Sequence, residues 1–132
     1  MAVVVPLADA RLLALPGRVS REIVGATTGA RAVALRHVTI EPEGPGGPGR
    51  GKHVHDGFEE VMVVLSGEGI TECDSGRLPV KAGDTIYMPA DERHATRNTG
   101  TEPLVMLCFF PVVEVAAGTR EFPPESQTGS PA

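Results

Sequence analysis

The sequence contains no tryptophan, one tyrosine and four phenylalanines, and its twelve Lys and Arg are outnumbered by seventeen Asp and Glu, which gives a formal net charge of −5. So few aromatic side chains cannot form a platform on which bases stack. The acidic balance argues against a surface that binds nucleic-acid phosphates. We therefore expect no nucleic-acid partner.

Cysteine and long apolar runs are also scarce. Cys73 and Cys108 lack CxxC spacing, so we expect two buried, reduced thiols in a cytoplasmic protein, with a disulfide between them as the alternative. No run approaches the roughly 20 apolar residues that a membrane helix needs. Pro6, Asp9 and Arg11 interrupt the N-terminal apolar stretch, and no basic n-region precedes it. We expect neither a membrane segment nor a signal peptide.

Chain-breaking residues, by contrast, are abundant: the sequence has sixteen Gly and twelve Pro. No convincing helical period appears, and short runs rich in Val, Ile, Leu and Thr lie between the breaks. Many short strands at close spacing favour an all-β sandwich or barrel, and 132 residues are the size of one domain. We predict strands near 31–41, 52–55, 60–65, 69–73, 78–81, 85–89, 93–98 and 104–110.

The chain divides into three predicted parts. Residues 1–30 form an N-terminal arm, with a strand-like stretch at 18–24, that could pack on a second subunit. Because exposed sheet edges tend to be paired or covered, we expect a homodimer. Residues 31–115 form the barrel, and its Pro- and Gly-rich segment 42–51 is a loop at the barrel mouth. Residues 116–132 form a C-terminal tail that is partly disordered.

Two histidines and a glutamate follow this loop at informative spacing. Alternate residues of a strand point to the same side, so His53 and His55 place two imidazoles on one face. Glu60 lies five residues beyond His55 and would fall on the opposite face of a continuous strand. The Asp56-Gly57 pair predicts a turn that brings Glu60 back to the same site.

A third histidine belongs to a second stretch with a similar turn. Pro89 ends a strand because it cannot donate to the ladder, and the chain then re-enters a strand with His94. A lone HxH pair is more often structural than a ligand. A carboxylate and a distant histidine with matching turns favour a metal site instead. Three imidazoles and a carboxylate suit Fe(II), Mn(II), Ni(II), Zn(II) or Cu(II).

These residues resemble the two signature motifs of the cupin superfamily, G-x5-H-x-H-x3/4-E-x6-G and G-x5-P-x-G-x2-H-x3-N. The family's Gly between Pro and His is Asp91 here. Since Asp tolerates unusual backbone angles better than most residues, we expect the turn to survive. The spacing to Gly67 selects Glu60 rather than Glu59 as the ligand. Nine of ten motif positions agree: Gly47, His53, His55, Glu60, Gly67, Gly83, Pro89, His94 and Asn98.

The resemblance implies a cupin fold, a double-stranded β-helix or jelly-roll barrel of two antiparallel sheets, that holds one divalent metal ion with His53, His55, Glu60 and His94. Fold alone does not fix function. The first expectation is a small-molecule enzyme with an Fe(II)-dependent, oxygenase-like reaction; Mn, Ni, Zn and Cu are the other candidate metals. One alternative is a non-redox cyclase, isomerase or lyase of secondary metabolism that uses Zn or Ni. Another is a non-catalytic binding or sensor module.

Two further residues are candidate catalytic groups. Tyr87 could offer a phenol to the pocket or simply pack in the core. Arg50 flanks the predicted mouth and could hold a substrate carboxylate, and a solvated loop charge is the alternative. The sequence shows no conspicuous basic cluster. This absence favours a small or moderately apolar substrate.

Overall fold

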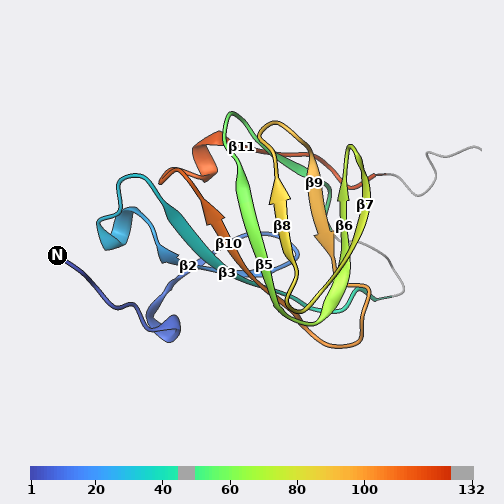
Figure 1. Ribbon diagram of the computed structural model, residues 1–132, viewed down its shortest axis with the longest axis horizontal. Coiled ribbons are helices and arrows are strands. Elements are labelled where there is room, and N and C mark those ends of the chain that lie inside the picture. Colours follow the sequence, from blue (N-terminus) through green and yellow to red (C-terminus); the bar gives the residue numbers. More distant parts are fainter. Residues whose placement is uncertain (45–49, 126–132) are drawn as a thin grey trace, which may run out of the picture.

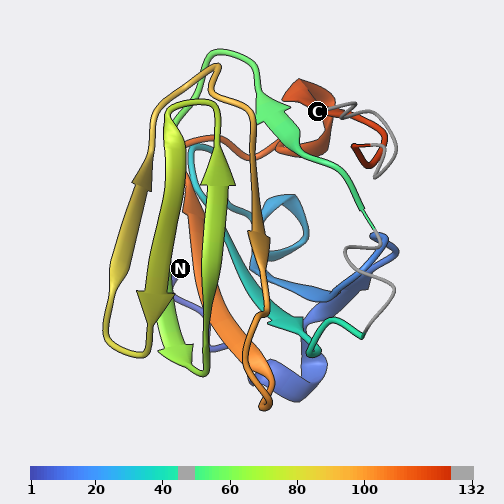
Figure 2. The same ribbon diagram turned by 90° about the vertical axis from the view of Figure 1, so that its right-hand side faces the viewer.

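The computed structural model describes residues 1–44 and 50–125, which fold into two antiparallel β-sheets (Figures 1 and 2). In sheet order, the six-stranded sheet comprises β1 (Arg11–Leu13), β2 (Val19–Val24), β3 (Ala34–Ile40), β10 (Leu104–Phe110), β5 (Glu60–Ser66) and β8 (Thr85–Met88). The five-stranded sheet comprises β11 (Thr119–Glu121), β4 (His53–His55), β9 (His94–Arg97), β6 (Glu68–Cys73) and β7 (Gly76–Lys81). Three short 3-10 helices lie outside the sheets: η1 (Leu7–Asp9) before β1, η2 (Ala26–Thr28) between β2 and β3, and η3 (Ala116–Gly118) between β10 and β11.

The core lies between the sheets and follows from the two-residue period of the strands. In β10, the side chains of Leu104, Met106, Cys108 and Phe110 are buried, while the residues between them are less so. β5 alternates in the same way, and its buried face begins with Glu60 and continues with Met62 and Val64. One inward face therefore carries both core packing and a candidate ligand.

The eight predicted strands all have counterparts, and the predicted all-β, two-sheet fold is confirmed. The strand-like stretch at 18–24 corresponds to β2, which pairs with β3. Two further strands were not predicted, β1 and β11. β11 lies in the segment expected to be tail, and it pairs with β4 through Thr119 opposite His55. Each has three residues, too few to show a period, and β11 depends on a partner distant in the sequence.

Two residues of the motifs, Gly67 and Asn98, stabilise loops and are not candidate ligands. Gly67 has φ +85°, and a Cβ there would lie 2.5 Å from the carbonyl oxygen of Pro103, so this position requires glycine. Asn98 is fully buried and donates from Nδ2 to the carbonyl oxygens of Ile40 and Glu102, both at 2.8 Å. Residues 45–49, which include Gly47 and make up half of the predicted 42–51 loop, lie outside the described residues, as do residues 126–132.

At the N-terminus, the first residues extend away from the sheets before β1 forms the edge of the six-stranded sheet (Figure 1). Large apolar side chains are exposed along this stretch: Met1, Val3, Val4, Leu7 and Leu12. Within the described residues, no helix has the length and apolar composition to cross a membrane.

Candidate metal centre

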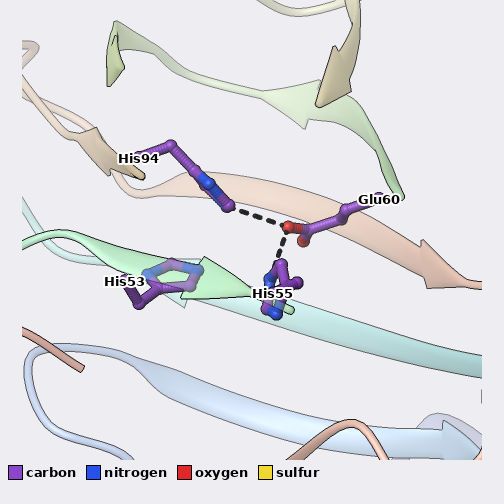
Figure 3. Close-up of side chains that lie close together, drawn as sticks. All are labelled: His53, His55, Glu60 and His94. Carbon is purple, nitrogen blue, oxygen red and sulfur yellow. Dashed lines mark hydrogen bonds and ion pairs between the residues drawn. The ribbon is translucent and has the colours of Figure 1, made fainter. Parts of the chain in front are cut away.

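The structure brings together the four residues predicted as ligands. His53 and His55 lie on β4, Glu60 opens β5 and His94 opens β9, so both sheets contribute (Figure 3). One donor atom from each residue lies within 4.8 Å of all the others. His55, Glu60 and His94 are buried, and His53 is half-buried. The arrangement is a candidate site for one metal ion.

Two turns position these side chains. Gly57 has φ +84° in the turn between His55 and Glu60, as the Asp56-Gly57 pair predicts. Asp91 has φ +69°, the one positive φ of a non-glycine residue in the parts of the chain described. Its backbone N–H donates to the carbonyl oxygen of His55 at 3.0 Å. The turn that the family builds with Gly is therefore preserved here with Asp.

Hydrogen bonds on the far side of two imidazoles determine which nitrogen faces the centre. His94 Nδ1 lies 2.9 Å from the carbonyl oxygen of Glu92, which can only accept, so Nδ1 carries the proton. His55 Nδ1 lies 2.9 Å from Thr119 Oγ1. That hydroxyl donates to the carbonyl oxygen of Val115 at 2.6 Å and therefore accepts from His55. With the Nδ1 proton fixed in this way, Nε2 is the nitrogen that carries the lone pair in the neutral form of each ring.

These two lone pairs point at one carboxylate oxygen. Glu60 Oε1 lies 3.0 Å from His55 Nε2 and 3.1 Å from His94 Nε2 (Figure 3). Burial raises the pKa of Glu60, but the hydrogen bonds that His55 and His94 donate when a proton occupies Nε2 outweigh it and hold the pKa well below its ordinary value. Three electron-pair donors at this spacing need a cation among them, whether bridging protons or a metal ion. The donor set fits a metal ion.

His53 completes the set. Its Nδ1 is buried and has no hydrogen-bond partner among residues 1–44 and 50–125. Burial, followed by the charge of His94, lowers the pKa of His53 well below its ordinary value. The ring is therefore neutral at neutral pH and has an uncommitted nitrogen, the state in which imidazole binds metal.

Glu59 and Tyr87 lie outside this centre. Glu59 is exposed and accepts a hydrogen bond from the Tyr87 hydroxyl. On β8, Ile86 and Met88 point into the core, so the alternation turns Tyr87 outward and leaves it 58% exposed. The structure supports the choice of Glu60 over Glu59. It does not bring Tyr87 to the pocket, which corrects the expectation of a catalytic phenol there.

A cavity of about 180 Å³ adjoins the four residues, with an apolar wall that includes Val38, Met62 and Met106. Arg50 also lines it and is 8% exposed, so its charge is not that of a solvated loop residue. Arg18 and Arg36 join it there. The sequence shows no conspicuous basic cluster, but the fold brings these three separate arginines to the lining of one cavity.

Several cavity or supporting residues have no sequence signal of their own. Thr119 lies on the unpredicted strand β11, and Ser20 lies on β2, outside both motifs. In the sequence, Arg36 is a single charged residue within a predicted strand, and no motif marks it. Only the pairing of β2 with β3, and of β11 with β4, brings these residues to the centre.

A family model for the cupin domain matches residues 36–110, more than half of the chain, and the protein belongs to this family. An oxalate-binding protein from Thermotoga maritima is 36% identical over 63 residues, covering 48% of this chain and 52% of that protein. The chain spans about half the length of the first curated relatives it matches.

Two solved structures show how far the fold extends. An S161A mutant of Bacillus subtilis oxalate decarboxylase is 25% identical, with a TM-score of 0.71, covering 88% of this chain and 31% of that chain. Pac13 from Streptomyces, a nucleoside dehydratase, is 16% identical, with a TM-score of 0.75 and 100% coverage of both chains. The Pac13 match extends beyond the family model and includes the N-terminal strands.

Proposed function

We propose that this protein is a metal-dependent enzyme that acts on a small organic molecule in the cavity of its barrel, with one divalent ion bound by His53, His55, Glu60 and His94. The observation that carries the proposal is the meeting of His55 Nε2 and His94 Nε2 at a single oxygen of Glu60. This arrangement is costly unless a cation is shared, and it lies at a cavity.

The preferred reaction is oxygenase-like and uses Fe(II). Bound there, Fe(II) would supply a Lewis acid and a redox-active centre with positions left for substrate and dioxygen. The chain's own residues do the rest. Thr119 and Glu92 fix the two imidazoles by accepting their Nδ1 protons. Val38, Met62 and Met106 exclude water from one wall, and Arg50 presents a positive charge to the substrate.

A second candidate is a non-redox reaction, such as a lyase, isomerase or cyclase reaction with Zn or Ni. It is supported by the named activities of the structural relatives, a decarboxylase and a dehydratase. On this candidate, the ion polarises a carbonyl group and the cavity residues orient the substrate. We also propose a cytoplasmic location, which the two free thiols of Cys73 and Cys108 support.

Elemental analysis of protein purified anaerobically from its own host separates these candidates. The oxygenase proposal expects one iron per chain and substrate-dependent consumption of dioxygen. Full occupancy by redox-inert zinc contradicts the oxygenase and leaves the non-redox candidate. Protein that holds no metal under any loading condition contradicts both. Glu59→Gln is the matched control for Glu60→Gln, because the two carboxylates are adjacent but only one faces the cavity.

A further inference from the structure

Residues that line the cavity have buried polar atoms that no described residue satisfies. Within residues 1–44 and 50–125, five buried side-chain nitrogen or oxygen atoms have no hydrogen-bond partner, and four of them belong to residues that line this cavity. Native proteins leave few such groups without a partner. These four atoms are Ser20 Oγ, Arg36 Nε, Arg50 Nη1 and His53 Nδ1.

Arg36 is the least expected of these groups. It lies on the inward face of β3 between Ala34 and Val38, directly opposite Cys108 on β10. Its guanidinium sits over the ring of Phe110 at 5.4 Å. Burial lowers the pKa of Arg36, and the charges of Glu22 and Glu60 offset this only in part. A barrel core holds this cation without an ion-pair partner among the described residues.

Arg50 also lines the cavity and is held in place by hydrogen bonds and packing. Its Nη2 donates to the carbonyl oxygen of Thr96 at 3.0 Å, and its own carbonyl oxygen accepts from Arg97 Nη1 at 2.7 Å. Gly17 packs on its stem, where a Cβ would lie 2.9 Å from Arg50 Cδ. Burial, then the charges of Arg18 and Arg97, lowers the pKa of Arg50 to about 10. Its Nη1 is buried and has no hydrogen-bond partner among the described residues.

The charges around the cavity do not cancel. Glu121 is paired with Arg18 at 3.4 Å, and Glu60 belongs to the candidate metal centre. Glu22 opposes Arg36 across β2 and β3, but its carboxylate bonds Arg11 at 2.9 Å. Three arginines and two carboxylates line the cavity, and a divalent ion would add to the positive excess. The segments that supply Arg18 and Arg50 lie side by side (Figure 2).

We propose that Arg36, Arg50 and Ser20 form an oxyanion-binding subsite and that the substrate is a small organic acid, a carboxylate or a phosphate monoester. Its anionic group binds at the arginines while another part of the molecule faces the four candidate ligands. Two guanidinium groups and a hydroxyl supply the donors that such an oxyanion accepts from. This inference rests on the proposed function only in placing the other part of the substrate at the candidate metal centre.

The size of the cavity limits the ligand. At about 180 Å³ it is smaller than the roughly 300–1,000 Å³ of pockets that hold drug-sized ligands. An acid of few non-hydrogen atoms fits this volume better than a nucleotide or a long acyl chain. The apolar wall would contact the uncharged part of such a molecule, and the arginines would bind its anionic group.

Isothermal titration calorimetry with defined probes tests the subsite. The probes are malonate, inorganic phosphate and the neutral malonamide, each titrated into metal-loaded and metal-free protein. The variants are Arg36→Gln and Ser20→Ala, with Arg77→Gln as control because Arg77 is exposed and outside the cavity. We expect binding of malonate or phosphate but not malonamide, at least about tenfold weaker in Arg36→Gln and unchanged in Arg77→Gln. The tighter of the two anions identifies the acid class.

Malonate and phosphate also bind metal ions. Titration into metal-free protein therefore measures the contribution of the arginines to anion binding without that of the metal. Anion binding that persists without metal and depends on Arg36 supports the subsite, even if the chain fails to bind metal and the proposed function falls. Equal affinity in Arg36→Gln, binding that disappears with the metal alone, or no anion binding up to about 10 mM overturns it. Should Arg36→Gln fail to fold, Ser20→Ala and Arg36→Lys decide on the same criteria.

Discussion

The side-chain carboxylate of Asp91 accepts a hydrogen bond from the backbone N–H of Gly57 at 2.9 Å. Its backbone N–H donates to the carbonyl oxygen of His55. The turn before His94 is thus tied to the turn that follows His55. A departure from the family motif therefore adds a link between the two motifs that a glycine, having no side chain, cannot make.

Replacing Asp91 separates two opposing effects. A left-handed backbone costs a non-glycine residue about 1–2 kcal/mol, and an ordinary hydrogen bond contributes about 1 kcal/mol. Asp91→Gly removes both and should leave the free energy of unfolding nearly unchanged. Asp91→Ala keeps the strain and loses the bond, so it should be less stable by about 1 kcal/mol. Urea unfolding measures both; an Asp91→Ala protein as stable as wild type would show that the bond contributes nothing.

Removing a candidate ligand should abolish tight metal binding without unfolding the chain. For His94→Ala and Glu60→Gln, we expect metal affinity to fall by more than about 100-fold, beyond the effect of losing a supporting residue. Far-ultraviolet circular dichroism should be little changed, because the core between the sheets is made by apolar side chains. Glu59→Gln should bind metal like wild type. Stoichiometric, equally tight metal in His94→Ala would refute the ligand assignment.

Thr119 should matter to metal affinity although it is not a ligand. Thr119→Val keeps the shape of the side chain and removes the hydroxyl that accepts from His55 Nδ1. We expect metal affinity to fall about tenfold, as for residues that orient a ligand. Thr85→Val, an exposed threonine on β8, is the control. Competition with a metal chelator measures both; equal affinities would mean that His55 is oriented without Thr119.

The metal-free protein should lose stability as the pH falls from about 7 to 5. Burial holds the folded-state pKa of His53 well below its unfolded value, about 6.5. Below that value the unfolded chain binds a proton that the folded chain does not, so unfolding becomes more favourable. The depressed pKa of Glu60 acts only at lower pH. His53→Asn should show a shallower loss of thermal stability over this range; an identical slope would assign the effect elsewhere.

We predict a homodimer that uses the N-terminal edge of the six-stranded sheet. β1 ends that sheet, and Leu12 on it is 60% exposed. Val3, Val4 and Leu7 precede it, also exposed. Apolar residues at an open strand edge favour pairing with a second chain. Sedimentation at micromolar concentration should give the dimer mass and Leu12→Lys should weaken the dimer; a monomer for the wild-type chain would contradict the prediction.

Local signals in the sequence were enough to predict which four side chains meet at the candidate metal centre and to predict most strands. The HxH spacing, the Asp56-Gly57 turn and the step to His94 all act over a few residues. Arg36 and Thr119 could not be predicted in the same way, because their roles depend on which strands pair. The charge of Arg36 in β3 becomes part of a site only when β3 lies between β2 and β10 in the six-stranded sheet, with Arg36 on the cavity side. The prediction that the Tyr87 side chain faces the pocket was wrong for a related reason, because its orientation follows from the pairing of β8 with β5.

The position of Thr119 late in the sequence, on β11, also determines when His55 becomes oriented during synthesis of the chain on the ribosome. His94, the last candidate ligand, leaves the ribosome well before Thr119, the residue that fixes His55. At about 5–20 residues per second, the interval is of the order of seconds. During this interval, the nascent chain has all four candidate ligands, but the hydroxyl that orients His55 is not yet in place. Metal that enters in this interval meets a looser and less selective set of donors than the finished protein offers.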